Sequence, residues 1–114
     1  MSRAEGAVQV DPAPVFAALG DRTRLRLLGR LSEGGARSIA ALSADGGMTR
    51  QAVTKHLHVL EAAGLVASAR VGRESLYTYR PEPVDDARAY LAAVSAQWDE
   101  RLSRLKALVE RPTQ

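Results

Sequence analysis

The sequence predicts a mainly α-helical fold with one β-hairpin, built as a single domain. Three observations predict this fold class. Apolar residues recur every three or four positions over most of the chain, which is typical of amphipathic helices. Between residues 65 and 80 the pattern becomes β-like on both sides of a glycine. The chain has 114 residues, of which 46% are hydrophobic, and this length suits one domain with a modest core.

We expect the domain to occupy residues 11–110, between an N-terminal tail (1–10) and a short C-terminal tail (111–114). The first ten residues show no apolar periodicity. They lack the hydrophobic stretch of a secretory signal, and no apolar run approaches the roughly 18 residues of a membrane span. The expected location is therefore the cytoplasm, with no membrane as a partner.

Capping residues mark the first two helices. Asp11 followed by Pro12 predicts the start of a helix that runs to residue 19, because proline is well tolerated at the first helical position. Asp21 predicts the cap of a second helix over residues 22–32. Leucines recur three residues apart in that helix, and two glycines stop it.

The next two helices predict a helix-turn-helix. Ser38 is expected to cap a short helix, and residues 45–47 (Asp-Gly-Gly) predict a tight turn. Thr49 is then expected to cap a longer helix over residues 49–63, which Gly64 ends. A short helix, a glycine-bearing turn and a second capped helix are the parts of this motif.

A β-hairpin and one long helix complete the chain. The runs at residues 65–71 and 75–80 are expected to pair across a turn at 72–74. Two prolines then interrupt the chain, and the last helix is expected over residues 84–110. Its apolar positions follow in steps of three and four, at 84, 87, 91, 94, 98, 102, 105 and 109. This line is longer than a core of this size can cover, so a second chain is expected to pack against it.

The positive charge is concentrated in the middle of the chain. The formal net charge is +3. Residues 20–80 hold ten basic and five acidic residues, whereas residues 1–19 and 81–114 each carry one excess negative charge. A basic central segment suggests an anionic partner, most simply nucleic acid. A solvated basic surface is the alternative on charge alone.

The helix over residues 49–63 has two different faces at 100° per residue. Its apolar side chains gather on one side, and the other side carries groups that suit base edges and phosphates. A solvent-facing amphipathic helix is the alternative, but the basic hairpin that follows directly favours contact with DNA. The expected DNA-binding residues are Arg50, Gln51, Thr54, Lys55 and His58 on this helix, Arg70 and Arg73 on the hairpin, and Ser38 before the turn.

Three stretches carry a family resemblance. Residues 18–28 (ALGDRTRLRLL), 51–66 (QAVTKHLHVLEAAGLV) and 70–77 (RVGRESLY) resemble the opening signature, recognition helix and wing of ArsR-type winged-helix repressors. The likeness covers about residues 12–110. It implies a winged helix-turn-helix with a long C-terminal dimerisation helix. It also implies a homodimeric repressor that binds an imperfect palindrome in double-stranded promoter DNA.

The resemblance further implies that the first helix (about 11–19) and the last helix (about 84–110) form the dimer interface. In the last helix, residues 97–106 (QWDERLSRLK) resemble the branch of the family that senses no metal. The expected interface residues are Val15, Phe16, Leu19, Leu91, Val94, Trp98, Leu102 and Leu105.

No metal, other cofactor or catalytic activity is expected. The chain has no cysteine, and residues 36–42, where metal-sensing members of the family carry a thiolate motif, offer no ligand. Both histidines lie in the 49–63 helix; His56 is expected to pack against the core with a hydrogen bond, and His58 to face outward. Acidic residues are adjacent at positions 85–86 and at 99–100. Consecutive residues of a helix do not face each other, so neither pair can act as an acid–base pair and neither predicts an enzyme.

Two other functions remain open from the sequence. One is a regulator that responds to an unidentified small-molecule effector, held in an apolar pocket between the first and last helices. Phe16, Tyr90 and Trp98 would line such a pocket. The other is a protein-interaction module that uses the winged helix as a scaffold and binds no DNA, which the basic face disfavours.

Overall fold

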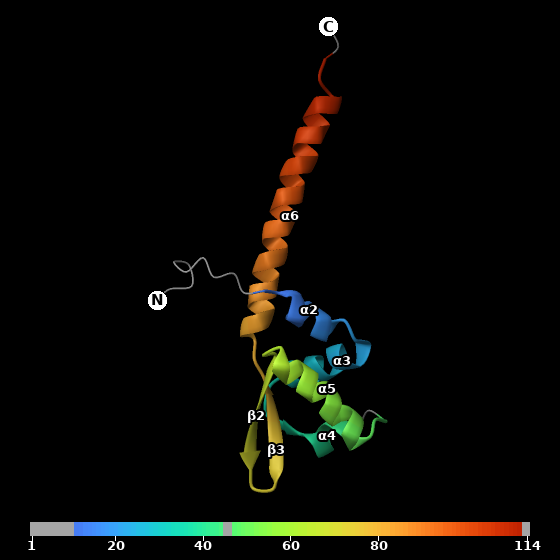
Figure 1. Ribbon diagram of the computed structural model, residues 1–114, viewed down its shortest axis with the longest axis vertical. Coiled ribbons are helices and arrows are strands. Elements are labelled where there is room, and N and C mark those ends of the chain that lie inside the picture. The colour runs from blue at the N-terminus through green and yellow to red at the C-terminus, as the bar shows by residue number, and fades with distance from the viewer. Residues whose placement is uncertain (1–10, 45–46, 113–114) are drawn as a thin grey trace, which may run out of the picture.

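The computed structural model describes residues 11–44 and 47–112, and it confirms the predicted fold class. Helices α2 to α5 and a small sheet form a body from which α6 projects (Figure 1). The predictions for residues 1–10, for 45–46 in the turn and for 113–114 lie outside the described residues. The elements are α2 (Ala13–Leu19), α3 (Arg22–Ser32), β1 (Arg37–Ser38), α4 (Ile39–Ala44), α5 (Arg50–Ala62), β2 (Val66–Val71), β3 (Glu74–Tyr79) and α6 (Glu82–Val109).

Side-chain caps set the helix starts as predicted. Asp21, Ser38 and Thr49 each accept a hydrogen bond from the backbone N–H three residues further on, at 3.0, 3.1 and 3.1 Å. Such bonds satisfy N–H groups that have no partner within the helix. Helix α2 begins one residue later than predicted, yet Asp11 still accepts from the N–H of Ala13 at 3.0 Å.

The end of α5 is also as the sequence predicts. Gly64 adopts a φ of +78°, a left-handed conformation that residues with a Cβ rarely take. The N–H of Leu65 then donates to the carbonyl of Leu60 at 2.9 Å, which is the longer bond of a Schellman motif. Leu65 is fully buried, so this turn directs the chain from α5 into the sheet.

The sheet has a strand that the sequence analysis missed. The strand order is β1-β3-β2, all antiparallel. The two residues of β1 pair with Tyr77 and Leu76 of β3. A strand of two polar residues has no alternation of apolar and polar positions, so local pattern gives no signal for it.

The hairpin is tighter than predicted. Val71 pairs with Glu74, so only Gly72 and Arg73 connect the strands, and the predicted three-residue turn is wrong. Gly72 has a φ of +62°, as two-residue hairpin connections commonly require at one or both positions. The shorter turn sets Arg70 opposite Ser75.

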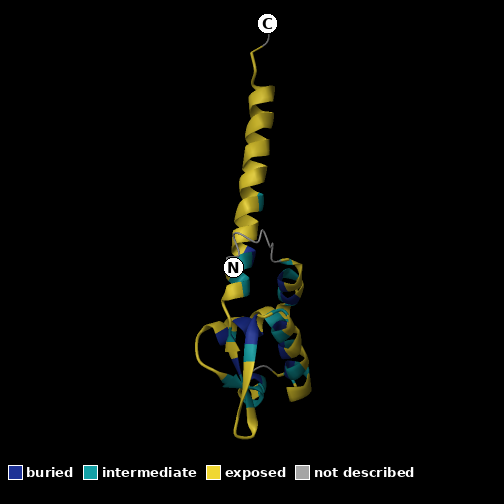
Figure 2. Cartoon of the chain, turned by 60° about the vertical axis from the view of Figure 1, so that its left-hand side comes forward, coloured by how far each residue is buried: buried dark blue, intermediate teal, exposed yellow. Residues whose placement is uncertain are grey.

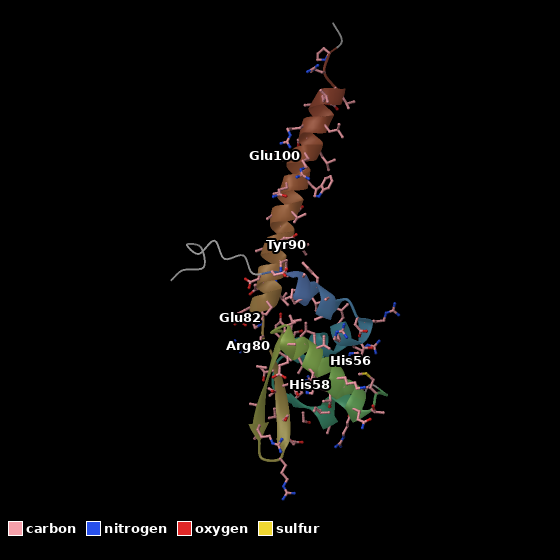
Figure 3. The ribbon with its side chains drawn as sticks, in the orientation of Figure 1. His56, His58, Arg80, Glu82, Tyr90 and Glu100 are labelled. Carbon is pink, nitrogen blue, oxygen red and sulfur yellow. The ribbon has the colours of Figure 1, made fainter. Side chains whose placement is uncertain are left out.

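Helix α6 begins at Glu82, two residues before the predicted start, and ends at Val109. The sequence predicts that Pro83 interrupts the chain, but the structure places it in the first turn of the helix. Proline is compatible with that position because N–H groups in the first turn have no intrahelical partner. Arg80 Nε donates to Glu82 Oε1 at 3.4 Å where β3 leads into the helix (Figure 3).

The core lies among α2, α3, α4, α5 and the sheet, and α6 contributes to it only at its base (Figure 2). Ala87 is the buried residue of α6. Further along the helix the line of apolar residues is exposed, from 53% for Leu91 to 74% for Val109, except for the partly buried Val94. The prediction that this line extends beyond the core is therefore confirmed. Within the described part of the chain, no helix combines the length and apolar character needed to span a membrane.

The Asp21 cap predicts a specific pH dependence of stability. The hydrogen bond from the Arg24 backbone N–H lowers the pKa of the Asp21 carboxyl below its ordinary value of 3.8. A lowered pKa in the folded state means that the ionised carboxylate stabilises the fold above that value, and that this contribution is lost as the pH falls through the folded pKa. Urea unfolding should show wild type more stable than Asp21→Asn at neutral pH, with the difference vanishing in strong acid. An equal difference at both pH values would contradict this assignment.

Candidate nucleic-acid interface

Helix α5 presents an inner apolar face and an outer polar face. Val53, Leu57 and Leu60 are each 0% exposed and hold the inner face in the core. The outer face forms one hollow of about 460 Å³. Its lining residues are the five that the sequence predicts for DNA on this helix, Arg50, Gln51, Thr54, Lys55 and His58.

A second hollow of about 340 Å³ joins the first at Arg50 and Thr54, which line both. It lies between the start of α4, helix α5 and the hairpin. Ser38, Arg70 and Arg73 line it, so the structure brings all eight predicted residues to one continuous surface. We call this surface the α5–hairpin face.

Two polar residues of the second hollow were missed by the sequence analysis. Glu74 and Ser75, from β3, line it together with Arg50, Arg70 and Arg73. Ser75 is the cross-strand partner of Arg70, so a two-residue turn would have predicted its position. The sequence alone did not fix that register.

The cations of the α5–hairpin face have no partner within the described part of the chain. No hydrogen bond or ion pair joins the side chain of Arg50, Lys55, Arg70 or Arg73 to another described residue. Several arginines elsewhere are occupied: Arg30 donates to the carbonyl of Leu42 at 2.8 Å, and Arg37, Arg80, Arg88 and Arg104 pair with acidic side chains. Four cations without a partner therefore lie along the two adjoining hollows.

Thr54 has a narrower role than the sequence suggests. Its hydroxyl donates to the carbonyl of Arg50 at 2.7 Å. A phosphate oxygen needs a hydrogen-bond donor, and this hydroxyl has only one proton. The methyl group and the acceptor lone pairs of Thr54 remain for a ligand, which favours contact with a thymine methyl over contact with phosphate.

The two histidines of α5 differ in surroundings (Figure 3). His58 is exposed and lines the outer hollow. His56 is partly buried, and its Nδ1 lies 3.4 Å from an Arg24 guanidinium nitrogen and 3.9 Å from Asp21 Oδ2. The prediction of a packed, hydrogen-bonded His56 is confirmed. Within the described residues, no group of three or more acidic or histidine side chains could hold a metal ion.

The residues predicted for a dimer interface fall into two groups. Val15 is 5% exposed, and Phe16 and Leu19 pack against the core of their own chain. On α6, Val94 is partly buried, whereas the other four predicted residues are more than half exposed: Leu91, Trp98, Leu102 and Leu105. The α6 residues therefore offer most of the uncovered apolar surface.

The rings proposed for an effector pocket do not lie together. Phe16 and Tyr90 are in contact, with centroids 6.2 Å apart. Trp98 lies about two turns further along α6, where the Arg101 guanidinium sits 5.5 Å from the ring centroid. Phe16 and Tyr90 thus hold α2 against α6.

The fold and the α5–hairpin face together define a DNA-binding winged helix-turn-helix protein. A helix-turn-helix domain model matches residues 19–69. The uncharacterized HTH-type transcriptional regulator YuzN of Bacillus subtilis (strain 168) is 42% identical over 76 aligned residues, and the alignment covers 61% of this chain and 83% of the relative. The chain belongs to the ArsR family of transcriptional regulators.

Solved structures extend the likeness to most of the chain. An ArsR-like transcriptional regulator from Rhodococcus sp. RHA1 is 38% identical, with a TM-score of 0.79 over 89% of this chain and 94% of that one. The homodimeric winged helix-turn-helix DNA-binding domain of a Mycobacterium bovis protein is 33% identical. Its TM-score is 0.59, over 88% of this chain and 87% of that one.

Gln51 lines the outer hollow of α5 and Arg73 lies in the hairpin turn, so we expect their substitutions to affect DNA binding differently. Gln51→Ala should lose discrimination between operator and random DNA by roughly 1–3 kcal/mol, because a glutamine amide can make two hydrogen bonds to adenine. Arg73→Ala should weaken binding to both DNAs alike and reduce the slope of log K against log salt by about one. Titrations at several salt concentrations measure both effects. Equal losses on every DNA for Gln51→Ala would contradict its assignment to a base.

Proposed function

We propose that the protein is a homodimeric transcriptional repressor that binds a palindromic operator in promoter DNA. In this proposal α5 is the recognition helix and enters the major groove. The β2–β3 hairpin is the wing and follows the adjacent backbone. Two recognition helices related by two-fold symmetry would contact half-sites about 34 Å apart, and the bound dimer would block the promoter.

The observation that carries the proposal is the set of free donors on the α5–hairpin face. Arg50, Lys55, Arg70 and Arg73 have no hydrogen-bond or ion-pair partner among the described residues. Four unpaired cations on one face repel one another, so a phosphate backbone is the partner that would best neutralise them. Gln51 and His58 on the same face add donors and acceptors of the kind that distinguish bases.

The exposed side of α6 supports the dimer. Trp98, Leu102 and Leu105 are 54, 54 and 55% exposed and follow one line along the helix. An apolar stripe of this kind is unusual on a soluble monomer and marks an interaction site. A second copy would cover it by two-fold symmetry, and the similar Mycobacterium bovis domain is homodimeric.

The proposal is tested by titrating labelled DNA from the gene's own upstream region with the purified protein, using fluorescence anisotropy. A shuffled fragment of the same length and composition is the control. We expect tighter binding to the upstream fragment, and affinity that falls steeply with salt on both DNAs. Equal, salt-insensitive binding to both, or no binding at low salt, would reject the proposal.

The dimer can be tested apart from the DNA-binding surface with Trp98→Ala. Covering the exposed half of this indole removes on the order of 130 Å² from water and stabilises the dimer by ~3 kcal/mol per ring. Sedimentation should show the variant dissociating at concentrations where the wild type is dimeric, together with weaker operator binding. The wing variant Val71→Ala is the matched control, since Val71 is similarly exposed at 58%. A Trp98→Ala protein that remains as dimeric as wild type would contradict the interface.

A further inference from the structure

Arg24, at the start of α3, connects two helices that the proposed function uses for different purposes. Its Nε donates to the carbonyl of Ala18 at 2.7 Å, and one terminal nitrogen lies 3.3 Å from the carbonyl of Ala17. Both carbonyls lie in the last turn of α2. The other terminal nitrogen lies 3.4 Å from Nδ1 of His56 on α5. One side chain therefore contacts α2 and α5 at once.

The contact is possible with one tautomer of the imidazole. A guanidinium carries only donors, so this hydrogen bond requires the His56 tautomer that has its proton on Nε2 and its lone pair on Nδ1. Asp21 lies 3.9 Å from the same Nδ1 and also accepts the backbone N–H of Arg24 at 3.0 Å. The carboxylate thus holds the start of α3 beside the contact.

The position of Arg24 suits the α2 side of the contact as well. The last carbonyls of a helix lack intrahelical partners, and a cation is favoured there by the helix dipole. Gly20 follows α2 directly, and its N–H donates to the carbonyl of Ala17 at 3.2 Å. Arg24 thereby closes the end of a helix of only seven residues.

We propose that Arg24 is a positioning residue that fixes the recognition helix α5 relative to α2 through His56. The inference rests on the proposed function, in which α2 and α6 join two copies and α5 reads DNA. His56 lies on the flank of α5 away from the outer hollow, whose lining residues do not include it. Arg24 and His56 thus affect DNA binding without touching DNA, by setting the spacing and tilt of the two recognition helices in the dimer.

The experiment compares an acceptor-deleting variant with an acceptor-preserving one. His56→Leu removes the lone pair that Arg24 uses, whereas His56→Asn can place its side-chain oxygen near the position of Nδ1. We expect His56→Leu and Arg24→Met each to weaken binding to the upstream DNA about tenfold, the scale of one hydrogen bond to a charged group. His56→Asn should restore most of the affinity. Sedimentation should show all three variants as dimeric as the wild type.

Double substitution adds an independent readout. If both residues act through one link, Arg24→Met combined with His56→Leu should weaken binding no more than the stronger single change. Leu42→Val, a core change on α4, which carries neither residue of the link, controls for lowered stability and should leave DNA affinity unchanged at the same temperature. If Arg24→Met fails to fold, the comparison of His56→Leu with His56→Asn still decides.

Two results would overturn the inference. One is unchanged DNA affinity in His56→Leu with the dimer intact. The other is equal weakening in His56→Leu and His56→Asn, which would indicate a role for the imidazole other than accepting from Arg24. Failure of the wild-type protein to prefer its upstream DNA would instead reject the proposed function, so the two failures are distinguishable.

Discussion

The functional surface depends on the complete burial of one face of α5. Val53, Leu57 and Leu60 have no accessible surface, and burying each such side chain stabilises the fold by about 1.5–3 kcal/mol. A rotation of the helix by one residue would expose one of them and carry a charged neighbour such as Lys55 into the core. Both changes are unfavourable, so the rotation of α5 is strongly defined. The residues that line the outer hollow must therefore point outward together.

Arginines of the same chain serve two different purposes. Arg24 and Arg30 donate to backbone carbonyls and stabilise helix ends and connections. Those of the α5–hairpin face have no such partner within the described chain. The residue type does not distinguish the two groups, because the difference lies in which neighbours the fold supplies.

This difference explains which features the sequence predicts well. Caps such as Asp21 and Thr49 act over three residues, and the apolar spacing of α5 is a local pattern, so both follow from short stretches. The pairing of β1 with β3 and the Arg24–His56 contact join residues far apart in the chain, 32 positions in the latter case, and no local signal marks them. The register of the hairpin is partly predictable. The sequence predicts the turn but makes it one residue too long, so the pairing of Ser75 with Arg70 is missed. The residues that line the outer hollow of α5 follow from the sequence, whereas the hydrogen bond from the Thr54 hydroxyl to the carbonyl of Arg50 does not.

Most of helix α6 projects beyond the body of the domain (Figure 1). Its 28 residues span about 42 Å, yet its buried residue lies near the base. The Phe16–Tyr90 contact joins α2 to α6, and Arg24 joins α2 to α5. A second copy that packs against α6 would therefore contact a helix that is linked through α2 to α5. In the proposed repressor, these contacts couple dimer formation to DNA binding.

Hydroxyl-radical footprinting of the wild-type protein on its own upstream DNA tests the central claim most directly. The account predicts two protected half-sites of matching pattern on one face of the duplex, with centres about one helical turn apart. Protection should appear at protein concentrations that support the dimer. A single protected patch without two-fold symmetry, or protection by a protein that sediments as a monomer, would contradict it.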